Sequence, residues 1–240
     1  MIDCAIVLAG GRGTRLGSLT DATPKPLLPV AGRPFLAHVL DYLVRQGITR
    51  VVLATGYRAQ VFEQSFGHEY RGLAVTHSPE TEPLGTGGAI ALALTRARVD
   101  APHVLVLNGD TYFPADLTAL AAVHAASQAR LSMVLRRVPD VSRYGRIALQ
   151  RNAVAAMDEK GGGGPGLING GTYLLSRAAF RADAPAGAFS LERDLLPRWI
   201  ARRSVAAVVA DDYFIDIGVP ADLQRAQQEL AESSLPGVLA

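Results

Sequence analysis

Short apolar runs that end at glycine or a polar residue alternate along the chain with segments whose apolar side chains recur at helical spacing. The apolar and β-branched runs predict strands over 4–9, 49–55, 73–77, 103–107, 131–137 and 205–210. The helical patterns predict helices over 36–44, 59–66, 85–97, 114–127, 190–199 and 220–231. This alternation predicts an α/β protein with a Rossmann-like, doubly wound, mostly parallel sheet that binds ligands at the carboxyl ends of its strands.

The alternation changes character after residue 138. The segments 142–147 and 154–160 predict short strands that pair antiparallel, and 167–173 and 213–218 predict two more. We therefore expect a single domain with a first part over about 1–138, a small lobe over about 139–216 and a C-terminal helix within 217–240.

Composition excludes several classes of partner. Of the 240 residues, 49% are hydrophobic and 19% charged, and the formal net charge of +2 is spread along the chain, which argues against nucleic acid or a membrane. No segment resembles a leader or reaches membrane-spanning length, so we expect a cytoplasmic protein. The single cysteine, Cys4, lies within the first predicted strand, and the histidines lack metal-ligand spacing, so we interpret them as structural.

A glycine-rich turn follows the first predicted strand. Gly10, Gly11 and Gly13 bring bare backbone N–H groups close to a ligand, and Arg12 and Arg15 add guanidinium donors, which together suit phosphate. Two better-known phosphate loops are excluded, because Leu16 stands where a dinucleotide fingerprint needs glycine and the chain has no Gly-Lys pair for a Walker A loop.

Lysine is rare in this chain. Of the 24 lysines and arginines, 22 are arginine, which leaves Lys25 and Lys160 (24 − 22 = 2). Pro24 and Pro26 frame Lys25 and predict a stiff, extended segment that aims its ammonium group. Because ammonium and guanidinium groups are not interchangeable, both lysines are candidate site residues, although Lys160 lacks such a frame.

Two further segments carry candidate chemistry. Asp110 follows a predicted central strand and a glycine, where an α/β enzyme would hold a hard cation, although an aspartate after Asn-Gly also simply forms turns. The glycines at 85, 87 and 88 either allow a flat group to contact the start of a helix, or only mark the point where the helix begins.

The chain resembles the nucleotidyltransferases that join a nucleoside triphosphate to a sugar 1-phosphate. The resemblance is carried by Gly10-Gly11-Arg12-Gly13-Thr14-Arg15-Leu16 and by Thr23-Pro24-Lys25-Pro26. One departure is Ser18, where the family usually has proline, which loosens the match to glucose-1-phosphate enzymes and leaves the phosphate-binding residues untouched. The resemblance implies a GT-A-like fold and a reaction that releases pyrophosphate.

The same resemblance implies roles for particular residues. It makes Arg15 and Lys25 catalytic, and Asp110 and Asp216 the ligands of Mg²⁺, which favours one or two carboxylates plus substrate phosphates. The implied nucleotide-binding residues are Leu8, Ala9, Gly10, Gly11, Gly13, Thr14, Arg15, Glu82, Gly85, Thr86, Gly87, Asn108 and Gly109. The implied sugar-phosphate-binding residues are Tyr144, Gly145, Glu159, Lys160, Asn169, Gly171, Tyr173 and Glu192. The glycine run at 161–164 is either a lid over the sugar site that the small lobe would hold or a disordered loop tip.

The resemblance also favours particular substrates, namely GTP and D-glycero-α-D-manno-heptose 1-phosphate. Uridylyl transfer to N-acetylmuramate 1-phosphate and guanylyl transfer to mannose 1-phosphate are alternatives, and the sequence leaves open whether the protein forms a homo-oligomer. A catalytically silent sensor of nucleotide sugars is a rival of another class. Such a protein would be expected to have lost Lys25, Asp110 or Asp216, and this chain retains all three.

Overall fold

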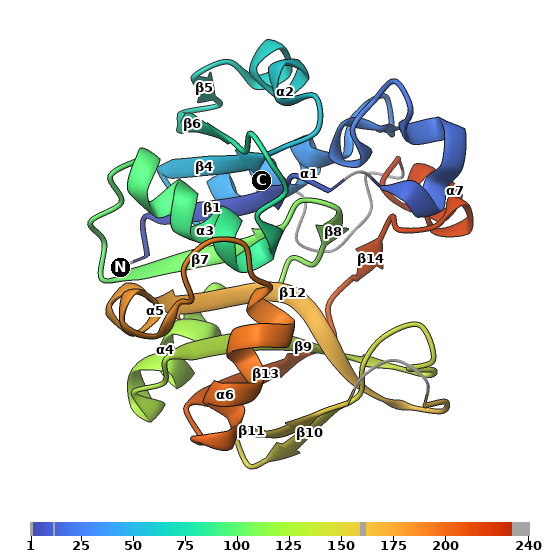
Figure 1. Cartoon of the computed structure of the whole chain (residues 1–240). Coiled ribbons are helices and arrows are strands. Elements are labelled where there is room, and N and C mark those ends of the chain that lie inside the picture. Colours follow the sequence, from blue (N-terminus) through green and yellow to red (C-terminus); the bar gives the residue numbers. More distant parts are fainter. Residues whose placement is uncertain (1, 12, 159–161, 232–240) are drawn as a thin grey trace.

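The computed structural model describes residues 2–11, 13–158 and 162–231, and in them a ten-stranded mixed sheet is the centre of the molecule (Figure 1). The strands follow the order β10-β11-β13-β9-β12-β7-β1-β4-β6-β5. One half is parallel and contains β7 (His103–Asn108), β1 (Cys4–Ala9), β4 (Arg50–Thr55) and β6 (Leu73–Pro79), with β5 (Glu69–Tyr70) antiparallel at the edge. The other half contains β9 (Leu131–Val138), β10 (Ile147–Gln150), β11 (Ala153–Met157), β12 (Gly166–Ser176) and β13 (Val205–Ala210).

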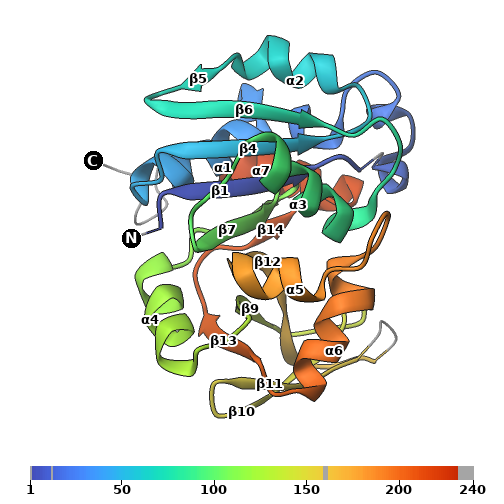
Figure 2. The ribbon, with the colours of Figure 1, turned by 60° about the vertical axis from the view of Figure 1, so that its left-hand side comes forward.

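Helices cover both faces of this sheet (Figures 1 and 2). One apolar core packs α1 (Phe35–Arg45), α2 (Ala59–Phe66), α4 (Leu117–Ser127) and α7 (Pro220–Glu229) against one face. The second core packs α3 (Gly85–Arg96), α5 (Arg177–Asp183) and α6 (Leu196–Ala201) against the other. Alternate residues of β1 enter the two cores, as expected for a strand buried on both faces. The predicted α/β class is therefore confirmed. No helix in the described ranges has the length and apolar character needed to cross a bilayer.

The sheet continues across the predicted boundary near residue 138. Strand β12 runs antiparallel to both β7 and β9, and β9 also pairs with β13 in parallel. Because β12 lies between strands of the first part, the two predicted parts share one sheet. A shift in register between Asn169 and Tyr173 bends β12, and Gly171 in this bulge has a φ of 75° that favours glycine.

Three predicted elements differ from the structure. Residues 142–146 form no strand, because Asp140 accepts hydrogen bonds from Ser142 and from the backbone of Gly164, which closes a turn before β10. The antiparallel pairing of β10 with β11 is confirmed. The helix expected over 190–199 is divided into a π-helical turn, η3 (Leu191–Leu195), and α6, although Ser190 caps it as expected. Lys25 does not lie in an extended segment but begins a 3-10 turn.

Small elements gather at the carboxyl ends of β1, β4 and β7. They comprise η1 (Thr14–Thr20), η2 (Lys25–Leu27) and the ribbons formed by β2 (Pro29–Val30) with β3 (Arg33–Pro34) and by β8 (Thr111–Tyr112) with β14 (Ile215–Asp216). This edge of the sheet is where ligands of open α/β folds bind.

Candidate active site

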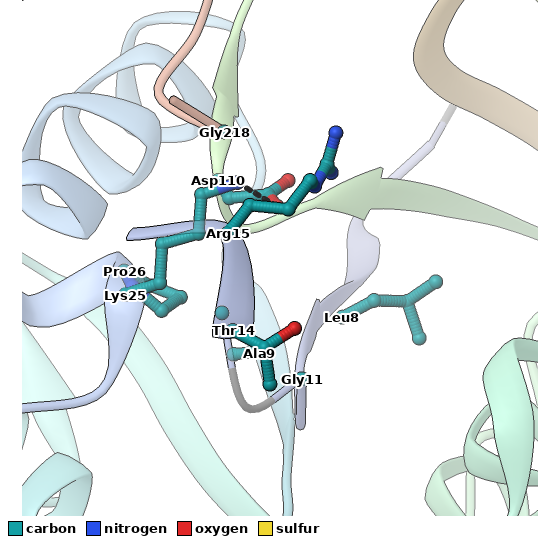
Figure 3. A pocket seen from close by; sticks show the side chains of 10 residues that line it. Leu8, Ala9, Gly11, Thr14, Arg15, Lys25, Pro26, Asp110 and Gly218 are labelled. Carbon is teal, nitrogen blue, oxygen red and sulfur yellow. Dashed lines mark hydrogen bonds and ion pairs between the residues drawn. The ribbon is translucent and has the colours of Figure 1, made fainter. Parts of the chain in front are cut away.

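The glycine-rich turn links β1 to η1. Gly13 has a φ of 65°, and a Cβ there would lie 3.0 Å from Thr20 Cγ2 and 3.1 Å from Lys25 Cβ. Glycine is therefore required both by the backbone conformation and by the close approach of Lys25. Arg15 and Thr14, in the first turn of η1, are exposed toward the cavity at this edge, whereas Arg12 lies outside the described residues (Figure 3).

Lys25 extends from η2 to two carboxylates. Its Nζ lies 2.6 Å from Asp110 Oδ2, as Figure 3 shows, and 3.4 Å from Asp216 Oδ1. The side chain of Lys25 is only 6% exposed. The 3-10 turn that presents it is closed by a hydrogen bond from Leu27 N to Pro24 O. A buried ammonium between two acidic groups has the strong, charge-assisted contacts that fix its position.

The β8–β14 ribbon brings the two aspartates together. Asp216 is paired with Thr111, and Ile217 N donates to Asp110 O at 3.1 Å. Burial and then the charge of Asp110 raise the pKa of Asp216 above its usual range, and Lys25 offsets part of this effect. The ribbon thus holds two carboxylates that repel one another, and a cation bound between them would reduce this repulsion.

These carboxylates suit a divalent cation. In the described part of the chain, no three His, Cys, Asp or Glu side chains gather into a complete cage. Magnesium does not need one, because it keeps several water or phosphate ligands beside one or two carboxylates. Asp110 remains 35% exposed toward the cavity, so an ion held there would also meet an incoming phosphate. The donor set therefore fits Mg²⁺.

Three cavities adjoin along this edge and share Gly11 as a lining residue. One of about 230 Å³ contains Arg15, Lys25 and Asp110. A second of about 350 Å³ runs to the start of α3, and a third of about 400 Å³ reaches the residues after β6. Of the predicted nucleotide-binding residues, those lining the cavities are Leu8, Ala9, Gly10, Gly11, Gly13, Thr14, Arg15, Glu82, Gly85, Thr86 and Asn108.

Two predicted nucleotide-binding glycines pack against protein instead of lining the cavities. A Cβ on Gly87 would lie 2.1 Å from Phe189 Cε2, and one on Gly109 would lie 2.9 Å from Leu8 O. The expectation of direct ligand contact is therefore corrected for both. Gly87 allows Phe189 to pack on α3, and Gly109 donates its N–H to Leu8 O, which joins β7 to β1.

The predicted sugar-phosphate residues that the structure describes lie on β12, in η3 and in the segment before β10. A Cβ on Gly171 would lie 2.8 Å from Asn108 Nδ2, so the bulge of β12 lies directly against the end of β7. Tyr144 packs edge-on against Phe214, two residues before Asp216. Gly145 approaches Asp158 O closely, which is a packing contact. Glu159 and Lys160 lie outside the described residues.

Tyr173 requires a correction. Its side chain is fully buried, so it does not reach a ligand directly. Its hydroxyl instead accepts a hydrogen bond from Asn169 Nδ2 at 2.6 Å and donates to Glu192 Oε1 at 3.3 Å. Tyr173 therefore holds two other predicted sugar-site residues in place.

Comparison with known proteins gives this arrangement a family. A family model described as Nucleotidyl transferase matches residues 4–233. The chain belongs to the nucleotidyl transferase family. This confirms the resemblance inferred from the glycine-rich turn and the proline-framed lysine.

Full-length relatives of this nucleotidyl transferase carry a more specific name. This chain is 39% identical over 226 residues to the D-glycero-alpha-D-manno-heptose 1-phosphate guanylyltransferase of Aneurinibacillus thermoaerophilus. The match covers 94% of this chain and 97% of the relative. The protein of that name from Campylobacter jejuni is 40% identical over 219 residues, covering 91% and 96%. The structure of HddC from Yersinia pseudotuberculosis complexed with GMP-PN matches with a TM-score of 0.82 at 36% identity, over 95% of this chain and 100% of that chain.

Glu80 is a site residue that sequence reasoning missed in this nucleotidyl transferase. Its Oε2 accepts from Leu84 N at 2.9 Å, and its carboxylate lines the two cavities next to Gly10. Burial raises the pKa of Glu80, and the hydrogen bond from Leu84 offsets part of this rise. Glu80 and Glu82 stand two positions apart in the sequence, and only the fold distinguishes Glu80 from Glu82, which is exposed.

Proposed function

We propose that this nucleotidyl transferase transfers GMP from GTP to D-glycero-α-D-manno-heptose 1-phosphate, forming GDP-heptose and releasing pyrophosphate. For the reaction class, the observation that carries the proposal is the contact of Lys25 with Asp110 and Asp216 beside the glycine-rich turn. For the substrates, it is the similarity to heptose 1-phosphate guanylyltransferases over nearly the whole of both chains.

In this reaction a phosphate oxygen of the sugar 1-phosphate attacks the α-phosphorus of GTP. The new P–O bond forms as the bond to the bridging oxygen breaks, and pyrophosphate leaves with the electron pair. Because the attacking phosphate is already an anion, the protein needs no covalent intermediate, and it must hold two repelling anions in line. Arg15 and the backbone N–H groups of the glycine-rich turn would hold the triphosphate, and Lys25 would stabilise charge that develops at the α-phosphate.

Asp110 and Asp216 would hold Mg²⁺. When bound, the ion supplies neutralisation of phosphate charge in the transition state and orients the triphosphate. Lys160 with Glu159, Asn169, Gly171 and Tyr144 would contact the sugar 1-phosphate. A GDP-activated sugar is a glycosyl donor, so we propose that the product serves synthesis of a surface polysaccharide such as lipopolysaccharide or capsule, from the cytoplasm.

Glu80 provides a physical reason for guanine. Guanine carries two adjacent N–H donors on its Watson–Crick edge, which a carboxylate accepts together, whereas uracil carries one donor between two acceptors. Glu80 lines the cavity between the glycine-rich turn and the start of α3, and its Oε2, which accepts from Leu84 N, keeps a second lone pair that can act together with Oε1. The proposal therefore assigns base selection to this residue.

Pyrophosphate release tests the proposed function directly. GTP, UTP, CTP and dTTP are each combined with heptose, mannose and N-acetylmuramate 1-phosphates, with and without Mg²⁺. We expect the highest kcat/KM for GTP with the heptose 1-phosphate. A preference for UTP with N-acetylmuramate 1-phosphate, or for GTP with mannose 1-phosphate, would replace the proposed substrates, and release with no pair would remove the activity itself.

A further inference from the structure

A half-buried carboxylate, that of Glu192, joins the start of α3 to the predicted sugar side of the site. Glu192 Oε2 accepts hydrogen bonds from Thr86 Oγ1 at 2.6 Å and from Ser190 Oγ at 3.0 Å. Thr86 and Glu192 are 106 positions apart in the sequence. Since Thr86 also lines the cavity beside the glycine-rich turn, this contact connects a nucleotide-facing residue to a different part of the fold.

The connection continues to β12. Tyr173 donates to the second oxygen of Glu192, and Asn169 donates its amide N–H to the Tyr173 hydroxyl. The other end of the Asn169 side chain accepts from Gly171 N at 3.0 Å in the bulge. Four side chains, Thr86, Glu192, Tyr173 and Asn169, thus form one chain of hydrogen bonds that we call the Glu192 network.

Further hydrogen bonds join the start of α3 to the segment 189–192, which carries Glu192. Phe189 O accepts from Gly87 N at 3.0 Å, Phe189 N donates to Leu84 O at 2.9 Å, and Leu191 N donates to Thr86 Oγ1 at 2.9 Å. The ring of Phe189 fills the space left by the missing Cβ of Gly87. A shift of the α3 start therefore requires a shift of the segment 189–192, and the reverse is also true.

We infer that the Glu192 network couples the two substrate sites, so that binding of the nucleotide orders Asn169 for the sugar 1-phosphate and binding of the sugar 1-phosphate orders Thr86. This inference rests on the proposed function. In this inference Glu192 is a positioning residue, because its carboxylate accepts hydrogen bonds from three protein donors. Charge-assisted hydrogen bonds are strong enough to transmit an orientation between contacting residues.

Coupling of this kind is measurable as a ratio of affinities. The dissociation constant of a non-hydrolysable GTP analogue is measured by calorimetry with and without saturating heptose 1-phosphate. In the wild type we expect saturating sugar phosphate to lower the dissociation constant of the analogue about 5-fold or more. By reciprocity, the analogue should lower the dissociation constant of the sugar phosphate by the same factor.

Tyr173→Phe is the most informative variant, because Tyr173 is fully buried and its loss removes no contact with substrate. We expect Tyr173→Phe and Thr86→Val each to reduce the coupling ratio to near 1, and the double variant to reduce it no further. Thr95→Val is the matched control on α3, since its hydroxyl donates only to Ala91 O on the exposed side of the helix. Its coupling ratio should equal that of the wild type.

The outcomes separate the two proposals. If the wild type binds the analogue and the sugar phosphate with no mutual effect, or if Tyr173→Phe keeps the wild-type ratio while its thermal midpoint is unchanged, the coupling is refuted and the proposed function stands. If the wild type neither binds the GTP analogue nor releases pyrophosphate from GTP, the proposed function fails first. A loss of each separate affinity with an unchanged ratio would make the network only structural.

Discussion

At the scale of single residues, the rarity of lysine has a geometric reason in this protein. Lys25 Nζ contacts two different carboxylates, and a Cβ on Gly218 would lie only 3.3 Å from it. A compact ammonium fits this space, whereas a guanidinium is planar and larger. The chain uses arginine for most of its positive charge, so the lysine at position 25 reflects a demand of this site.

We expect Lys25→Met to lower kcat/KM by about 10²-fold or more, the usual scale for loss of one preorganised electrostatic partner. Methionine retains the stem that packs near Gly13, so the far-ultraviolet circular dichroism should match that of the wild type. Steady-state kinetics checks this. Lys25→Arg should recover little of the lost activity, and wild-type rates in either variant would remove Lys25 from the mechanism.

Asp110→Asn and Asp216→Asn should each raise the Mg²⁺ concentration needed for half-maximal activity, because each variant removes one anionic ligand. Asp100→Asn is the matched control, since its side chain is 87% exposed and does not line the cavity that contains Lys25. Titration of activity with Mg²⁺, and of the free protein with Mn²⁺ by electron paramagnetic resonance, measures the effect. Unchanged metal titrations in both site variants would show that these carboxylates do not share an ion.

Glu80→Gln should reduce the preference for GTP over UTP by about 10-fold, because an amide presents one acceptor and one donor where the carboxylate presents two acceptors. Glu82→Gln is the control, as Glu82 is exposed and, of the three cavities, lines only the one of about 400 Å³ after β6. The ratio of kcat/KM for the two nucleotides is the measurement. If Glu80→Gln and Glu82→Gln leave this ratio equally unchanged, the base is read by another group.

At the scale of elements, hydrophobic pattern predicted most strands and helices because each is buried on a recognisable face. Strand β13 and helix α2 have the predicted bounds. The pattern failed over 142–146, where Asp140 closes a turn, and it did not reveal that η3 and α6 divide the helix over 190–199. The first difference arises from hydrogen bonds of Asp140 with Ser142 and the Gly164 backbone, which leave no periodic signal. The second falls at Pro197, which has no N–H to continue a helix.

Gly87→Ala should destabilise the protein by about 1–3 kcal/mol, because its Cβ would meet the ring of Phe189 at 2.1 Å and force the core to shift. This cost exceeds the gain of about 1 kcal/mol from better helix propensity. Gly162→Ala, where a Cβ meets nothing within 4 Å, should change stability little. Urea unfolding compares the two variants, and adding Phe189→Leu to Gly87→Ala should restore part of the loss. Equal stability of both glycine variants would contradict the packing role.

At the scale of the whole molecule, the site depends on contacts between distant parts of the sequence. Lys25 meets Asp110 and Asp216 across 85 and 191 positions. The sequence identified these three residues by motif and by resemblance, and the carboxyl edge of the parallel sheet together with the β8–β14 ribbon explains why they converge. It could not identify Glu80 or the buried position of Tyr173, since these depend on the turn after β6 and on the bulge in β12.

Stability of the whole fold should fall on acidification because of His124. This side chain on α4 is buried against Ser132 of β9 and His103 of β7, and burial, followed by the charge of His103, lowers the pKa of His124 to about 4. The unfolded chain, with a histidine pKa of about 6.5, then binds one more proton than the folded chain between these two pH values. The free energy of unfolding therefore decreases as the pH falls through this window, by about 3 kcal/mol in total.

His124→Asn removes this titrating group. The free energy of unfolding of the variant should therefore fall less steeply with decreasing pH than that of the wild type. At pH 7 the variant should be less stable than the wild type by about 1 kcal/mol, because its hydrogen bonds are poorer, and below pH 5 the difference should vanish or reverse. Subtracting the two unfolding free energies at each pH cancels the aspartates, glutamates and other groups common to both proteins. A difference that stays constant from pH 7 to pH 4 would mean that His124 binds protons equally in the folded and unfolded chains.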